Sequence, residues 1–236
     1  MPLPLNGHHV MKNIVLTIFI LLFSLNAYGR NLVWDDEFSL WKNAASHWLS
    51  GVKSHCNLGN IYIEKGDFGR AKTEFEQALR LRPAFVPARA GLGHVYNALG
   101  RYQEAQAEFE EALKVRPLFA EAHYGLGNMY SSLRFYDEAE KEFQAALRLK
   151  PDYVEAYNNL GIVYGIKRDY VRALKPFEEA LRLRPDYPKI HYNLGITYKI
   201  LGRYKEARIE FQEALRLTRD DTEAQMIRKK LQELQG

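Results

Sequence analysis

The chain has 236 residues, of which 47% are hydrophobic and 26% charged, and its formal net charge is +4. This charge is mild and the sequence contains no nucleic-acid-binding motif, so we expect no nucleic-acid partner. A single cysteine excludes an internal disulfide. Phosphate-binding loops, Gly-x-Ser-x-Gly, His-Glu-x-x-His and paired-cysteine motifs are absent from the sequence. We therefore expect a protein that is not an enzyme and that needs no cofactor or metal ion.

Residues 11–29 have the features of an export signal. Lys12 precedes an apolar stretch over residues 14–25, and Ala27-Tyr28-Gly29 places small residues where a signal peptidase reads. The apolar stretch is shorter than the about 20 residues that a membrane span needs. We therefore predict a signal peptide or an N-terminal anchor over residues 1–29, with Met11 as an alternative start. The expected location is the bacterial periplasm or the exterior, and the alternative is an inner-membrane tether through residues 14–25.

From residue 52 onward the sequence repeats with a period of 34 residues. Copies of the motif Leu-Gly-x-x-Tyr, each followed at fixed distances by Ala, Phe and Ala, begin at Leu58, Leu92, Leu126, Leu160 and Leu194. In the copy at 86–119, Gly100 separates two predicted helices, 87–99 and 102–114, and Pro117 ends the second one. Gly93 would let the helices approach closely, and Phe109 would fill the adjoining space. Each helix is too short to be stable alone, so the units must stack.

This period and these residues resemble the tetratricopeptide repeat (TPR) family over residues 52–221. The resemblance implies an all-α fold, a right-handed α-solenoid of five helix-turn-helix repeats with the ranges 52–85, 86–119, 120–153, 154–187 and 188–221. Two positions depart from the family pattern. In the first four repeats a proline follows the second helix, and in the fifth repeat Arg219 stands at that position. Pro176 lies inside the predicted second helix of repeat four, where the other repeats have glutamate. We expect Pro176 to kink that helix, either as a tolerated feature of the outer wall or as a functional hinge.

Capping segments are predicted at both ends of the repeats. One period before the first repeat, Trp41 falls on the Phe position and Trp34 on a Tyr position, so residues 30–51 form an N-terminal half-repeat, or alternatively an aromatic docking surface. Residues 222–236 form a C-terminal capping helix. Thr222 would cap its first turn, and its inner stripe would consist of Met226, Ile227, Leu231 and Leu234.

In the TPR family the first helices line a concave wall along which ligands lie. The resemblance implies a peptide-binding groove formed by Asn57, Asn60, His94, Tyr124, Asn128, Asn158, Asn159, Lys189, Tyr192 and Asn193. An Asn side chain presents both a donor and an acceptor, so it can pair with a peptide backbone without reading its sequence. Of these residues, Asn57, Asn159 and Asn193 match the asparagine ladder of the O-GlcNAc transferase superhelix, which Gly91 and Gly125 interrupt in this chain. For Asn159 and Asn193 the alternative role is a hydrogen bond between repeats. Asn128 and Asn158 are the stronger candidates for ligand contact.

The sequence therefore predicts a non-enzymatic protein–protein interaction scaffold that binds an extended peptide segment of a partner in the concave groove. The alternative is a structural or self-associating accessory subunit of a cell-envelope assembly for polysaccharide or secretion. Self-association would use the aromatic N-terminal segment or the convex wall. The envelope role is suggested by a short similarity of Ser39-Leu40-Trp41 and Asn57-Leu58-Gly59 to the TPR tails of some bacterial multi-pass membrane proteins of the glycosyltransferase type.

Overall fold

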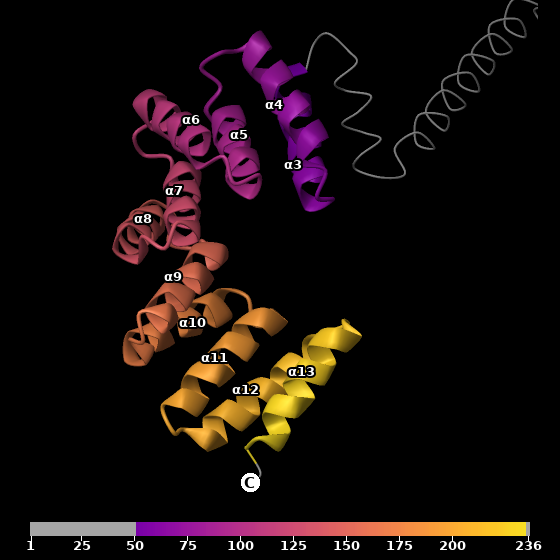
Figure 1. Ribbon diagram of the computed structural model, residues 1–236, viewed down its shortest axis with the longest axis vertical. Helices are drawn as coiled ribbons and strands as arrows, with labels where there is room; N and C mark the ends of the chain where they lie inside the picture. Colours follow the sequence, from indigo (N-terminus) through magenta and orange to yellow (C-terminus); the bar gives the residue numbers. More distant parts are fainter. Residues whose placement is uncertain (1–50, 235–236) are drawn as a thin grey trace, which may run out of the picture. The chain divides into compact units, whose positions relative to one another are not determined.

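The computed structural model describes residues 51–234, and every regular element in that range is an α-helix (Figure 1). The helices are α3 (Gly51–Glu64), α4 (Phe68–Leu81), α5 (Val86–Ala98), α6 (Tyr102–Val115), α7 (Ala120–Ser132), α8 (Tyr136–Leu149), α9 (Val154–Ile166), α10 (Tyr170–Leu183), α11 (Pro188–Ile200), α12 (Tyr204–Leu217) and α13 (Asp221–Gln232). They form the five predicted helix-turn-helix hairpins, followed by a final helix. The predicted signal segment and N-terminal half-repeat lie outside the described residues.

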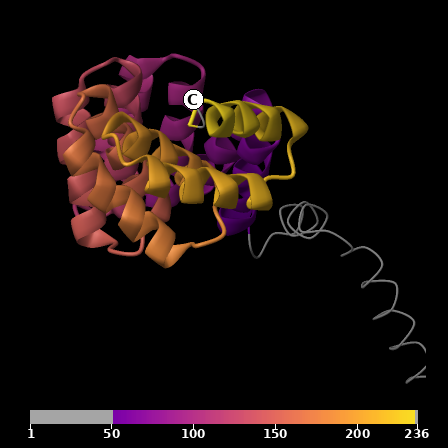
Figure 2. The same cartoon turned by 90° about the horizontal axis from the view of Figure 1, so that it is seen from below.

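The helices belong to two compact units. The first ends at Pro83 and contains α3 packed on α4, and the second begins at Ala84 and contains α5 to α13. Within the second unit each first helix packs on its own second helix and contacts the next first helix, so that α5 meets α7, α7 meets α9 and α9 meets α11. Figures 1 and 2 show α5 to α13 following one another in a curved stack, which is the arrangement of an α-solenoid. No helix within 51–234 combines the length and apolar character that crossing a bilayer requires.

The repeated glycine and phenylalanine make the closest contact inside each hairpin. The five Phe side chains are at most 2% exposed. A Cβ atom added to Gly93 would lie 2.7 Å from Cε1 of Phe109, well inside van der Waals contact. Because protein cores are close-packed, a larger residue would displace the ring. This confirms the predicted close approach of the two helices at Gly93.

The turn inside each hairpin contains one residue with a positive φ. This residue is Gly66, Gly100 and Gly202 in three repeats, with φ of 72–74°, and it is Arg134 (65°) and Arg168 (60°) in the other two. Glycine adopts this left-handed conformation freely, whereas a residue with a Cβ atom is strained there. The tight turn is therefore kept in the two repeats that lack glycine, at a cost in conformational energy.

A basic residue on the first helix pairs with a glutamate on the second helix in most hairpins. His55–Glu74, His123–Glu142 and His191–Glu210 are 2.6–2.7 Å apart, and Arg89–Glu108 are 3.0 Å apart. The cation and the glutamate are always 19 residues apart in the chain.

In repeat four both members of this pair are replaced. Tyr157 stands at the position of the cation and Pro176 at that of the glutamate. Pro176 therefore leaves no buried cation without a partner. Helix α10 continues through Pro176 and is as long as the other second helices, with 14 residues. The proline does not end the helix, and the expected kink stays a prediction.

The final helix differs in two details from the sequence-based expectation. Its N-cap is Asp220, whose Oδ1 accepts the backbone N–H of Glu223 at 2.9 Å, so the predicted cap at Thr222 is wrong. A carboxylate at this position satisfies a backbone donor of the first turn. Ile227 is buried as expected, but Met226 is 51% exposed and does not belong to the inner stripe.

Candidate functional site

The predicted asparagines of repeats three to five form one hydrogen-bonded network. Asn159 on α9 donates through Nδ2 to Asn128 Oδ1 on α7 at 2.8 Å and to the Tyr124 hydroxyl at 3.3 Å. Asn158 Nδ2 donates to Asn159 Oδ1 at 3.0 Å, and Asn193 Nδ2 on α11 donates to Asn158 Oδ1 at 3.1 Å. The network, which we call the amide network, therefore joins three successive first helices through side chains that are all partly exposed.

From the sequence we expected two groups of asparagines, one bonding between repeats and one contacting a ligand. In the structure, members of both groups belong to the same amide network. Asn159 and Asn193 make hydrogen bonds between repeats, which was the alternative role for them. Asn128 and Asn158 were the preferred ligand contacts, yet they accept those same bonds. All four amides are therefore oriented by one another, and all four residues are partly exposed. Asn193 Oδ1 accepts no hydrogen bond from any residue in 51–234.

Two aromatic residues of the predicted groove, His94 and Tyr124, are uncharged at neutral pH because of burial. Burial lowers the pKa of His94 to about 4 and raises the pKa of Tyr124. The ring of Tyr124 lies 4.7 Å from that of Tyr153 and 6.1 Å from that of His94, centroid to centroid. These groups therefore contribute packing and hydrogen bonding rather than charge.

Gly125 occupies the ladder position of repeat three, and the structure explains why no asparagine is found there. A Cβ atom at Gly125 would lie 2.2 Å from Cε1 of Phe109, which belongs to the preceding repeat. The ring fills the space that a side chain would need. In repeat three the amide function comes instead from Asn128, about one helical turn further along α7.

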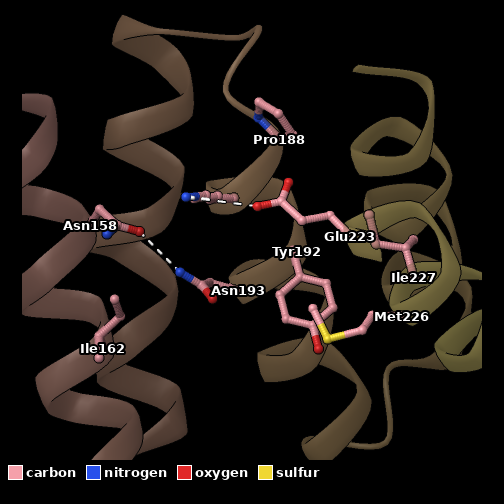
Figure 3. Close-up of a pocket in the computed structure, with 9 residues that line it drawn as sticks. Asn158, Ile162, Pro188, Tyr192, Asn193, Glu223, Met226 and Ile227 are labelled. Atoms are coloured by element: carbon pink, nitrogen blue, oxygen red, sulfur yellow. Dashed lines mark hydrogen bonds and ion pairs between the residues drawn. The ribbon is translucent and has the colours of Figure 1, made fainter. Parts of the chain in front are cut away.

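Two concave regions border the amide network, and both include Ile162. The first, which we call the polar hollow, is lined by Asn97, Asn128, Ser131, Ser132, Asn159 and Ile162. Oδ1 of Asn97 is buried there and has no hydrogen-bond partner within the described residues. The second, which we call the apolar pocket, has a volume of about 280 Å³ and is lined by Asn158, Ile162, Pro188, Lys189, Tyr192, Asn193, Glu223, Met226 and Ile227 (Figure 3).

Two predicted groove residues, Lys189 and Tyr192, line the apolar pocket. The pocket also includes residues that were not predicted from the sequence. Lys189 pairs with Glu223 on α13 at 3.7 Å, and Tyr192 packs on Phe211 with ring centroids 5.8 Å apart. Glu223 and Met226 were not predicted as site residues. They follow Lys189 and Tyr192 by one 34-residue period, so α13 is in register with the first helices. Extending the repeat by one helix would have found them.

The remaining predicted groove residues, Asn57 and Asn60, lie on α3 in the first unit. Asn57 is half-buried and Asn60 is exposed. The structure does not bring them into the amide network, whose members all belong to the second unit.

Residues 51–234 contain no cluster of three or more side chains that could hold a metal ion. Burial raises the pKa of the Cys56 thiol to about 12, so this cysteine is a packing residue rather than a nucleophile. The amide network, the polar hollow and the apolar pocket therefore offer hydrogen-bonding groups and apolar surface along α7, α9 and α11.

Comparison with known proteins agrees with this architecture. Tetratricopeptide repeat models match residues 52–85, 91–152, 130–188 and 167–231. The Drosophila melanogaster protein O-mannosyl-transferase Tmtc2 is 36% identical over 75 residues, which are 30% of this chain and 8% of that protein. The chain thus matches only a small part of this curated relative.

Two solved structures have the same fold. Pseudomonas aeruginosa PilF is 22% identical with a TM-score of 0.69, and the match covers 78% of this chain and 83% of PilF. YrrB, described as a TPR protein with an unusual peptide-binding site, is 24% identical with a TM-score of 0.55, over 80% of this chain and 97% of YrrB. With the matches of the family models across residues 52–231, these findings show that the chain belongs to the tetratricopeptide repeat family.

Proposed function

We propose that the chain is a non-enzymatic scaffold that binds an extended segment of a partner protein along the first helices α7, α9 and α11. The observation that carries this proposal is the amide network, which crosses three helices beside a hollow containing an unpaired buried acceptor, Asn97 Oδ1. A peptide main chain offers one N–H and one C=O at almost every residue. The partly exposed amide side chains of the network can pair with both.

The spacing of the helices suits an extended ligand. Packed helices lie about 8–10 Å apart, and an extended chain advances about 3.3 Å per residue. Each repeat therefore spans about three ligand residues. Recognition through main-chain groups would depend weakly on sequence, so any selectivity must come from neighbouring pockets.

Family and fold support a scaffold in general terms. TPR proteins are protein-interaction modules, and YrrB is described as having a peptide-binding site. The YrrB likeness concerns the fold, so the amide network itself carries the proposal of peptide binding. The short match to Tmtc2 does not bring its transferase activity to this chain. We also propose that the scaffold works outside the cytoplasm, on the basis of residues 11–29 alone.

A crosslinked pull-down from cell envelopes tests the proposed groove. The native chain is compared with the triple variant Asn128→Ala/Asn158→Ala/Tyr192→Ala. A matched control, Lys141→Ala/Lys175→Ala/Lys205→Ala, changes exposed residues on the second helices α8, α10 and α12. Thermal unfolding midpoints confirm that both variants fold.

We expect a partner that is captured by the native chain and the control but lost by the groove variant. Retention of every partner by the groove variant, or equal loss from both variants, would overturn the proposal.

A further inference from the structure

We infer that the apolar pocket between α9, α11 and α13 holds one uncharged apolar side chain of the bound segment and thereby determines which segments bind. This inference rests on the proposed function, because it concerns the same face of the molecule. It adds a ligand specificity that the amide network alone would not provide.

The lining of the pocket leaves apolar area uncovered. Ile162 is 36% exposed and Met226 is 51% exposed, although both line a concave site. Tyr192 lies beside Met226 at the same pocket (Figure 3). Covering apolar surface is favourable, and the flexible thioether of methionine adapts to side chains of different shape. The pocket therefore suits a Leu, Ile, Met or Phe side chain.

The charges around the pocket favour an uncharged occupant. Lys189 and Glu223 are the two charged lining residues, and they pair with each other at 3.7 Å. Glu223 also accepts a hydrogen bond from the Thr218 hydroxyl at 3.0 Å. A charged ligand side chain would lose hydration and meet no net opposite charge. An apolar side chain has no such cost.

The amide network places this pocket in line with the rest of the proposed groove. Asn158 and Asn193 belong to the network and also form part of the pocket wall. A main chain held by these amides would pass the opening of the pocket. The polar hollow also includes Ile162 and is lined by Asn128, Ser131 and Ser132 of α7, so the ligand should carry small or polar residues over α7. By the helix spacing, its apolar residue should follow about three to six positions away.

The test uses short random peptides displayed on phage and selected on the full-length native chain. We expect the selected peptides to share one apolar position. Labelled copies of two selected peptides are then titrated by fluorescence anisotropy, together with versions in which that residue is changed to serine. The change should weaken binding about ten- to hundredfold, which corresponds to losing one buried apolar side chain.

Two protein variants show whether the pocket is responsible. Met226→Ser should weaken the selected peptides several-fold and leave the serine-containing peptides unchanged. Ile166→Ser is the matched control, because Ile166 is 48% exposed on α9 but does not line the pocket. This control should bind like the native chain.

The outcomes separate this inference from the proposed function. If the peptides bind and depend on Asn128 and Asn158 but share no apolar position, or if Met226→Ser affects both peptide versions equally, the inference alone is wrong. If no peptide binds, or binding is insensitive to Asn128→Ala and Asn158→Ala, the proposed function fails as well. If the native chain self-associates in sedimentation and Met226→Ser makes it monomeric, a second copy occupies the pocket and the inference is overturned.

Discussion

Replacing Arg134 and Arg168 by glycine should stabilise the protein. Both arginines have a positive φ, 65° and 60°, at the position where Gly100 has 72°. The left-handed conformation costs a residue with a Cβ atom about 1–2 kcal/mol, and the greater freedom of glycine in the unfolded chain offsets about 0.5–1 kcal/mol of the gain. Both arginine side chains are exposed, so their removal loses little. We expect a gain of about 0.5–1 kcal/mol per substitution.

Urea unfolding followed by circular dichroism measures this gain as a higher midpoint with an unchanged slope. The double variant should show about the sum of the two effects, because the turns are a full repeat apart. Gly100→Ala is the reverse experiment and should lower the free energy of unfolding by a similar amount. If the arginine variants are no more stable than the native chain while Gly100→Ala is neutral, the turn conformation does not carry the strain assigned to it.

Three further predictions concern stability. Gly93→Ala should lower the free energy of unfolding by about 1–2 kcal/mol, because its Cβ would lie 2.7 Å from Phe109. Gly165→Ala should instead raise it by about 0.5–1 kcal/mol, since apart from its chain neighbours and the local helix backbone no atom lies within 4 Å of that Cβ position; equal effects in urea unfolding would contradict the packing argument. Burial disfavours the charged ring of His191, but its bonds to Glu210 and the Pro185 carbonyl outweigh burial and raise its pKa. The stabilisation from His191 is therefore complete below about pH 6.5 and is lost as the pH rises through the folded-state pKa. The difference in unfolding free energy between the native chain and His191→Gln should therefore shrink as the pH rises above about 6.5, whereas that for Arg89→Gln should stay constant because arginine remains charged.

In the repeat at 86–119, the period and its breakers predicted both helices to within one residue. Each copy couples a glycine on the first helix to a phenylalanine on the second, and this close contact fixes where the helices must cross. The start and the buried face of the final helix were harder to predict, because the sequence contains no second copy of this helix for comparison. Asp220 and Thr222 are both good N-caps, and the start of α13 at Asp221 decides between them. Met226 looked like a core residue by its spacing, but it occupies a groove position of a sixth first helix.

The sequence predicted which residues belong to the candidate site, but it did not predict how their side chains are hydrogen-bonded to one another. Spacing placed Asn128, Asn158, Asn159 and Asn193 on neighbouring helices, yet which amide donates to which depends on side-chain rotation, which a sequence pattern does not contain. The cation–glutamate pairs across the hairpins could have been found. Their 19-residue separation recurs with the period of the repeat, and the joint loss at Tyr157 and Pro176 is visible in the sequence.

Site-specific photo-crosslinking would show which face of the protein a bound partner contacts. A photoreactive residue is placed at Ser131, which lines the polar hollow, or at Lys141, which is exposed on the second helix α8. If an extended segment binds along α7, α9 and α11, Ser131 should crosslink to one continuous segment of a partner protein and Lys141 should not. Equal crosslinking at both positions, or crosslinking of the partner at Lys141 alone, would contradict the claim that the face of α7, α9 and α11 is the binding site.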